Sequence, residues 1–259
     1  SVYGNVDGWS ELLWPHRWAL YSFDAYINGA RVYDYTFELT ESSYFTAGVL
    51  CHEFFHVLGA PDLYHYNNTG APDAVGGWDL MESTSNPPQY MGAFLKWKYG
   101  DWIPEIPEIT STGTYTLNPL QEPENSSYKI ASPNSDTEYY VLEYRVKEGA
   151  YDSNTPGSRD GLLVYRINTE AGNGNAQGPP DEVYLYRPGG TLTSQGSFVS
   201  APYNSVWSHT ELNDFTNPEP FLYNGGNGGP GGLNLLNVGA GGETITFTIS
   251  MGAPTIELD

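Results

Sequence analysis

The sequence predicts an α+β protein, with helices in the first half of the chain and short strands through most of the second half. Apolar residues recur at helical spacing around residues 45–58, whereas beyond residue 107 short β-branched and aromatic runs alternate with polar turns. The chain has 30 glycines and 19 prolines, mostly in its second half, and 15% aromatic residues. This composition is typical of a β-rich fold with many turns.

The composition of the chain disfavours several classes of function. At 259 residues and 39% hydrophobic content, the chain is long enough for a substantial core, in one large or two medium domains. A net charge of -21 disfavours binding to nucleic acid or to an anionic membrane surface. The single cysteine excludes an intrachain disulfide, and no apolar run is long enough to span a membrane. The N-terminus has no signal-peptide pattern, so an exported form would have lost its signal upstream.

Residues 17–39 predict a β-hairpin, because aromatic and β-branched residues flank Asn28-Gly29, a dipeptide suited to a tight two-residue turn. A helix of about four turns is expected next. Thr40 or Ser42 offers an N-cap for this helix, and apolar residues then follow helical spacing up to Gly59, which favours a helix end.

A second helix is predicted after Pro87-Pro88, over the sequence QYMGAFLKWKYG, with its end at Gly100. Pro104 and Pro107 follow and mark a predicted domain boundary. It divides the chain into residues 1–106 and a β-rich, sandwich-like module of residues 107–259. Strands in this module are predicted at TYTL, YKIA, EYYVLEYRV, GLLVYRI, EVYLYR and TITFTIS. A long loop rich in glycine, asparagine and proline is expected over residues 204–237.

The stretch HEFFHVLGAPD, which begins in the first helix and continues past its end, predicts a metal site. On a helix, His52 and His56 share one face and present two imidazoles to one ion, while Glu53 is turned about 100° away. A carboxylate placed there can act as general base toward a zinc-bound water. Gly59 allows a left-handed turn that brings Asp62 back as a third ligand. The alternatives are an ordinary amphipathic helix, and an Asp62 that only caps a turn.

HEFFHVLGAPD also resembles the HExxHxxGxxD motif of metzincin zinc peptidases, and GGWDLMESTSNPPQYMGAFLKWKYGDWI resembles the segment that follows it in immune inhibitor A peptidases. The resemblance runs with gaps from Trp14 to Ile167. It implies a metzincin-like catalytic domain with Zn²⁺ on His52, His56 and Asp62, and Glu53 as general base.

The resemblance further assigns Met81 to the Met-turn beneath the metal, although a core methionine is an alternative. Tyr90 is the nearest candidate for the tyrosine that assists the oxyanion in some metzincins. The implied protein is a secreted or cell-surface bacterial zinc endopeptidase that hydrolyses protein or peptide substrates with a zinc-activated water. The alternative function is a glycan- or protein-binding surface module with a vestigial or latent zinc site.

Several further expectations concern the surroundings of the motif. Only 51 residues precede His52, which is short for a metzincin domain, so we expect further strands, and any pro-segment, upstream; the alternative is a minimal catalytic domain. Oxygens of Asp62, Asp73 and Asp79 offer a Ca²⁺ site, with a solvated acidic loop as the alternative.

The remaining side chains near the motif are expected to have ordinary roles. Cys51 is expected in the core, because position i-1 points away from the two histidines. We expect His16, His65 and His209 at the surface.

Overall fold

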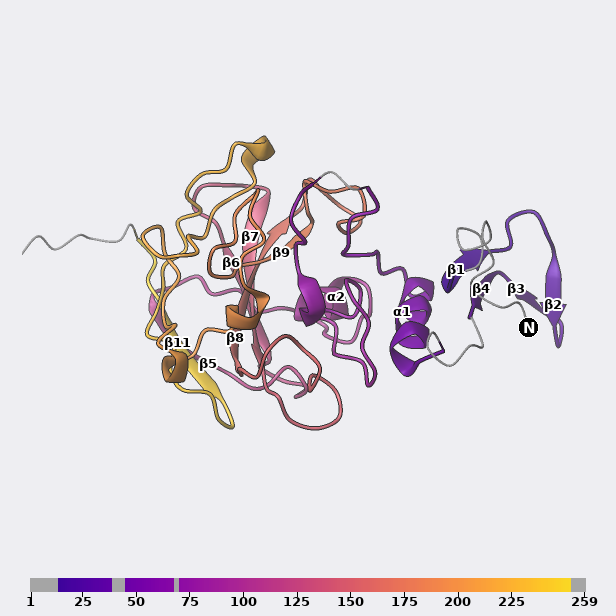
Figure 1. Ribbon diagram of the computed structural model, residues 1–259, viewed down its shortest axis with the longest axis horizontal. Helices are drawn as coiled ribbons and strands as arrows, with labels where there is room; N and C mark the ends of the chain where they lie inside the picture. The colour runs from indigo at the N-terminus through magenta and orange to yellow at the C-terminus, as the bar shows by residue number, and fades with distance from the viewer. Residues whose placement is uncertain (1–13, 39–44, 68–69, 253–259) are drawn as a thin grey trace, which may run out of the picture.

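The computed structural model describes residues 14–38, 45–67 and 70–252, and Figure 1 shows their arrangement. In these residues the chain forms two α-helices, several short 3-10 helices and a larger number of strands. The predicted mixture of helix and sheet is therefore confirmed, with sheet dominant. The metzincin fold and the sandwich arrangement stay predictions.

The predicted hairpin is present at the N-terminal end of the described chain. β2 and β3 pair antiparallel around Asn28 and Gly29, whose φ angles of 50° and 81° are those expected for the turn. β1 and β4 pair antiparallel outside this hairpin and contact α1 (Figure 1). The bounds are His16–Ala19 for β1, Ala25–Ile27 for β2, Ala30–Val32 for β3 and Asp34–Phe37 for β4.

The first helix, α1, spans Ala47–Val57 and is about one turn shorter than predicted. Its N-cap is Thr46, whose hydroxyl accepts a hydrogen bond from the Val49 N–H at 3.2 Å. The predicted caps, Thr40 and Ser42, lie outside the described residues. The predicted end is confirmed, since Gly59 adopts a positive φ of 101°. The expectation for Cys51 was wrong, because this side chain is exposed.

The second helix, α2, spans Ala93–Lys98 and begins later than predicted. The segment before it is held by tertiary hydrogen bonds. The N–H groups of Tyr90, Gly92 and Ala93 donate to carboxylates from other parts of the chain, at 3.0, 2.7 and 2.6 Å. A helix started at Pro88 would need the N–H groups of Gly92 and Ala93 for its own bonds, so these carboxylates delay its start.

Two sheets form the second half of the chain. A four-stranded antiparallel sheet has the order β6-β7-β8-β9, and a three-stranded antiparallel sheet has the order β10-β11-β5. The bounds are Gly113–Leu117 for β5, Ser127–Ala131 for β6, Glu138–Arg145 for β7, Gly161–Asn168 for β8, Val183–Leu185 for β9, Leu235–Leu236 for β10 and Ile245–Ile249 for β11. All predicted strands are present, and β10, with two residues, is too short to stand out inside the predicted loop.

The 3-10 helices are single turns: η1 (Gly76–Trp78), η2 (Phe198–Ser200), η3 (Ser205–Trp207) and η4 (Asn224–Gly226). None was predicted, because one turn is too short to show helical periodicity. Three of them lie within or next to the predicted loop of residues 204–237.

The hydrophobic core is continuous across the predicted boundary at residues 106 and 107. Trp78, Met81 and Phe94 belong to the same buried cluster as Leu142 and Val164 of the four-stranded sheet. The division into two domains stays a prediction, but the two parts share packing. No helix within the described ranges has the length and apolar character needed to cross a membrane.

Candidate metal centre

Two histidines of α1 are oriented by backbone carbonyls. His52 Nδ1 lies 3.0 Å from the carbonyl oxygen of Leu80, and His56 Nδ1 lies 2.7 Å from that of Ala60. A carbonyl can only accept, so Nδ1 carries the proton in both rings. In the neutral imidazoles Nε2 is therefore left with its lone pair, which is the arrangement found in metal-ligating histidines.

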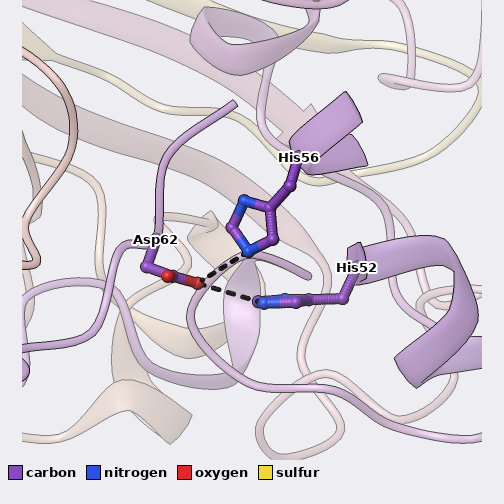
Figure 2. Close-up of side chains that lie close together, drawn as sticks. All are labelled: His52, His56 and Asp62. Carbon is purple, nitrogen blue, oxygen red and sulfur yellow. Dashed lines mark ion pairs between the residues drawn. The ribbon is translucent and has the colours of Figure 1, made fainter. Parts of the chain in front are cut away.

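Asp62 completes a cluster with these two nitrogens, as Figure 2 shows. Its Oδ1 lies 3.0 Å from His52 Nε2 and 3.3 Å from His56 Nε2, and the residue is only 4% exposed. Bonds of about 2.0 Å at tetrahedral angles place ligand atoms roughly 3.3 Å apart, so the observed spacing suits one ion. We refer to His52, His56 and Asp62 as the ligand cluster.

The electron pairs in the ligand cluster converge without a donor between them. Asp62 Oδ1 is buried and has no hydrogen-bond partner among the described residues, and it faces two nitrogens whose protons are on the opposite side of their rings. Lone pairs that face one another in this way are stabilised only by a cation or by added protons. The three residues therefore fit a metal ion.

Asp62 is prepared to be a charged ligand. Burial alone would raise its pKa, but in the absence of a cation the protonated rings of His52 and His56 can donate to it, and these bonds together with that of Tyr66 hold the pKa well below its usual range. The Tyr66 hydroxyl donates to Asp62 Oδ2, which leaves Oδ1 to face the histidines. The carboxylate is thus both ionised and fixed in direction.

Glu53 lies beside the ligand cluster and is buried. Burial raises its pKa, while the charges of His52 and His56 oppose this shift and that of Asp62 adds to it. Its carboxyl group therefore interacts electrostatically with all three members of the ligand cluster, and a buried carboxyl group with a raised pKa is suited to take up and release a proton.

A second carboxyl group, Glu38, was missed by sequence analysis. It follows β4, and its pKa is raised by burial and by the charge of Glu53. The signal was absent from the sequence, because α1 and β4 come together only through tertiary packing.

Met81 is fully buried, and its backbone supports the ligand cluster. Its carbonyl accepts from the Leu63 N–H at 2.9 Å, next to Asp62, while the preceding carbonyl, of Leu80, orients His52. The Met81 N–H donates to Asp79 Oδ1 at 2.8 Å. The turn of residues 79–81 therefore connects a histidine to the loop that carries Asp62. The position of the Met81 side chain beneath a metal stays a prediction.

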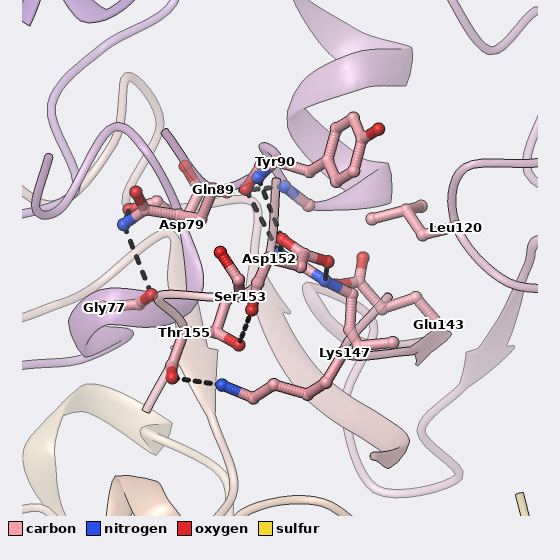
Figure 3. Close-up of polar contacts among 12 residues, drawn as sticks. Gly77, Asp79, Gln89, Tyr90, Leu120, Glu143, Lys147, Asp152, Ser153 and Thr155 are labelled. Atoms are coloured by element: carbon pink, nitrogen blue, oxygen red, sulfur yellow. Dashed lines mark hydrogen bonds and ion pairs between the residues drawn. The ribbon is translucent and has the colours of Figure 1, made fainter. Parts of the chain in front are cut away.

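Tyr90 has its described contacts away from the ligand cluster. Its ring lies 5.3 Å from the ring of Tyr151, Lys96 Nζ lies 4.7 Å from its centroid, and its N–H donates to Asp152 (Figure 3). Tyr64 and Tyr66 lie at the cluster instead: the Tyr64 ring is stacked 6.4 Å from that of His52. The sequence could have indicated them, because both tyrosines follow Asp62 within four residues.

The acidic loop does not form a second ligand set. Within the described ranges, the ligand cluster is the one group of three or more His, Cys, Asp or Glu side chains with converging ligand atoms. Asp79 accepts from the N–H groups of Met81 and Gly92, and Asp73 Oδ2 accepts from Gln195. These contacts give the predicted Ca²⁺ site no support.

The surface expectation was wrong for His65. Its Nε2 lies 2.6 Å from Asp181 Oδ1, and each of the two side chains is 9% exposed. His16 and His209 are half-buried, the first stacked on Phe37 and the second on Tyr203.

Comparison with known families identifies the first third of the chain. The family model for the immune inhibitor A peptidase M6 catalytic domain matches residues 4–96. The resemblance inferred from the sequence is thereby confirmed over these residues, and the match supports a metallopeptidase acting on proteins or peptides. Neither the curated proteins nor the solved structures gave a match.

Proposed function

We propose that the protein is a zinc-dependent endopeptidase of the metzincin type. The observation that carries this proposal is the ligand cluster, in which two oriented imidazoles and one ionised carboxylate face a common point beside Glu53. Two neutral nitrogens and one carboxylate are a known catalytic zinc set with one coordination position left open. When bound, zinc supplies a Lewis acid that polarises the peptide carbonyl.

Glu53 is the general base in this proposal. Its carboxylate takes a proton from the attacking water as the new C–O bond forms, and it then returns this proton to the nitrogen of the leaving amine as the peptide C–N bond breaks. Burial raises the pKa of Glu53 and so brings it closer to neutral pH. A carboxyl group with such a pKa can both accept a proton and donate it again.

We assign the oxyanion contact to Tyr64 rather than to Tyr90. Tyr64 is partly exposed beside His52, whereas the described contacts of Tyr90 are with Tyr151, Lys96 and Asp152. Burial and the negative charges of Asp62 and Glu53 raise the pKa of Tyr64. Its hydroxyl therefore stays protonated at neutral pH and can donate to the oxygen that becomes negative.

We further propose that the enzyme acts outside the cell, because immune inhibitor A peptidases are typically secreted bacterial proteins. Residues 107–259 would then form a β-rich module that supports the catalytic part. The upstream strands and the pro-segment stay predictions.

The decisive experiment measures metal content together with hydrolysis of a casein-like substrate, with and without 1,10-phenanthroline. We expect about one zinc per chain and cleavage that the chelator abolishes. Glu53→Gln should keep the zinc and lower kcat by about 10²- to 10⁴-fold, because general base catalysis contributes that much.

Equal turnover by Glu53→Gln would refute the mechanism. Zinc binding without any cleavage by the unmodified protein would favour the surface-binding module with a vestigial or latent site.

A further inference from the structure

The loop that carries Asp62 is fastened to a distant part of the chain. We call residues 60–66 the ligand loop and residues 174–183 the clamp segment. The Asn175 N–H donates to the Asp62 carbonyl at 2.9 Å, and Asn175 Nδ2 donates to the Leu63 carbonyl at 3.0 Å. One asparagine thus bonds the backbone of the third ligand and that of the next residue.

Asn175 is itself fixed to the four-stranded sheet. It is fully buried, its Oδ1 accepts from the Val183 N–H at 3.0 Å, and its Nδ2 also donates to the Val183 carbonyl at 2.8 Å. Val183 begins β9, which pairs with β8. A continuous series of hydrogen bonds therefore runs from the sheet through Asn175 to Asp62.

Two further bonds tie the other end of the ligand loop to the same segment. The Tyr66 N–H donates to the Ala176 carbonyl at 2.9 Å, and His65 pairs with Asp181 as described above. Because Tyr66 also donates to Asp62 Oδ2, fixing its backbone helps to fix the direction of the carboxylate.

The contact between the two segments is too close for a side chain. Gly174 has a φ of +78°, and a Cβ at this position would lie 2.4 Å from the Asp62 carbonyl oxygen and 2.6 Å from Pro61 Cβ. Only glycine permits both this backbone conformation and this approach. The backbone of the ligand loop therefore rests directly on the clamp segment.

We propose that Asn175 is a positioning residue for the metal centre, acting through the backbone of Asp62 and Leu63. The inference rests on the proposed metal-dependent function. The two histidines are placed by the helix that bears them, but Asp62 depends on residues far along the chain, within the predicted accessory domain. Removing a group that orients a side chain bound directly to a metal typically weakens metal affinity 10- to 100-fold.

The test compares Asn175→Ala with Asn204→Ala in the chain of 259 residues. Asn204 is also a buried asparagine whose side chain joins two backbone segments, donating to the Asp160 carbonyl at 3.2 Å and accepting from the Val206 N–H at 2.9 Å. Affinity for Zn²⁺ is measured by competition with a chromophoric chelator, and the ligand field by the visible absorption of the Co²⁺ form. Thermal unfolding reports the loss of stability in each variant.

Asn175→Ala keeps the backbone N–H bond to Asp62 but loses the side-chain bonds to Leu63 and Val183, so the ligand loop is no longer joined to β9 through this side chain. We expect this variant to bind Zn²⁺ about 10- to 100-fold more weakly and to change the Co²⁺ spectrum. Asn204→Ala should stay within about twofold of the unmodified affinity, whatever stability it loses, because it has no bond to the ligand loop. Unchanged affinity and spectrum in Asn175→Ala would overturn the proposal.

If Asn175→Ala fails to fold, His65→Ala and His65→Gln replace it. Removal of the bond to Asp181 should weaken metal binding, and glutamine, which keeps a donor for Asp181, should restore it; equal affinities in all three proteins would reject the clamp. The proposed function is tested separately: a Glu53→Gln variant that still cleaves refutes the mechanism but leaves the clamp standing.

Discussion

The two sides of the ligand cluster are built differently. His52 and His56 belong to α1, whose main contacts with the described strands are those with β1 and β4, in a region where many large apolar residues are exposed. Asp62 lies in a loop that rests on the clamp segment and on the buried turn of residues 79–81. The comparison teaches that a helix brings two side chains to one face by its own geometry, although the Leu80 carbonyl still orients the His52 ring. The backbone of a loop residue such as Asp62, in contrast, is held by tertiary hydrogen bonds.

The two sides also differ in their ion pairs. On the N-terminal side, Arg31 pairs with Asp24 at 3.2 Å, with side chains 46% and 71% exposed. On the other side, Arg145 bonds Asp152 and Glu143 with all three side chains almost fully buried. Solvent screens the exposed pair of Arg31 and Asp24 and weakens it. The pairs of Arg145 are shielded from solvent, so removing one partner would leave a buried charge and would be costly.

The largest effect is expected when the loop ligand itself is removed. Asp62→Ala takes away one of three protein ligands and leaves the two helical histidines. Because loss of groups that merely orient ligands costs 10- to 100-fold in metal affinity, we expect peptidase activity to fall by more than about a hundredfold. Metal content and casein hydrolysis measure this, and near-normal zinc content would show that the two histidines suffice.

The next largest effect concerns stability. Asp152→Ala leaves the Arg145 guanidinium buried with one partner fewer and should lower the free energy of unfolding by about 3–5 kcal/mol. The matched change on the exposed side, Asp24→Ala, should cost less than about 1 kcal/mol. Urea unfolding of the three proteins tests the contrast, and similar losses in both variants would remove it.

A smaller effect should depend on pH. Burial raises the pKa of Asp79 from 3.8 to about 6. Between these values the folded protein binds more protons than the unfolded chain, so this group lowers stability as pH rises. The stability of the unmodified protein relative to Asp79→Asn should therefore fall by up to about 3 kcal/mol between pH 4 and pH 7. Urea unfolding of the metal-free proteins checks this, and a pH-independent difference would contradict it.

The smallest effect is expected in local opening. Backbone amides of β2 and β3 should exchange hydrogen at least roughly tenfold faster than those of β7 and β8, because the first pair is exposed and the second is buried on both faces. Hydrogen exchange followed by mass spectrometry measures both regions in one sample. Equal protection would mean that the N-terminal strands are as firmly held as the sheet.

The local features were predictable from the sequence. The hairpin at Asn28-Gly29, the shared helical face of His52 and His56, and the helix end at Gly59 all depend on residues within one or two turns of each other. The strands of the second half were also recovered, because each has a β-branched or aromatic run between polar turns. The place of Asp62 beside the two histidines was also predicted, since its loop follows directly from the helix end.

The features that were missed depend on contacts between distant segments. The late start of α2 is caused by carboxylates of Asp79, Glu143 and Asp152, and the burial of His65 by Asp181. No periodicity within a segment reveals which distant carboxylate it will meet. The proximity of Glu38 to Glu53 was invisible for the same reason.

The fastening of the ligand loop has a consequence for the timing of biosynthesis. Asn175 follows Leu63, which it bonds, by 112 residues in the chain. At the usual pace of roughly 5–20 residues per second, the ribosome adds Asn175 about 6–22 seconds after Leu63. If the clamp is needed for tight metal binding, the nascent chain carries HEFFH for this whole interval without an assembled centre. Metal binding by the ligand cluster would then become tight only after Asn175 has been added to the chain.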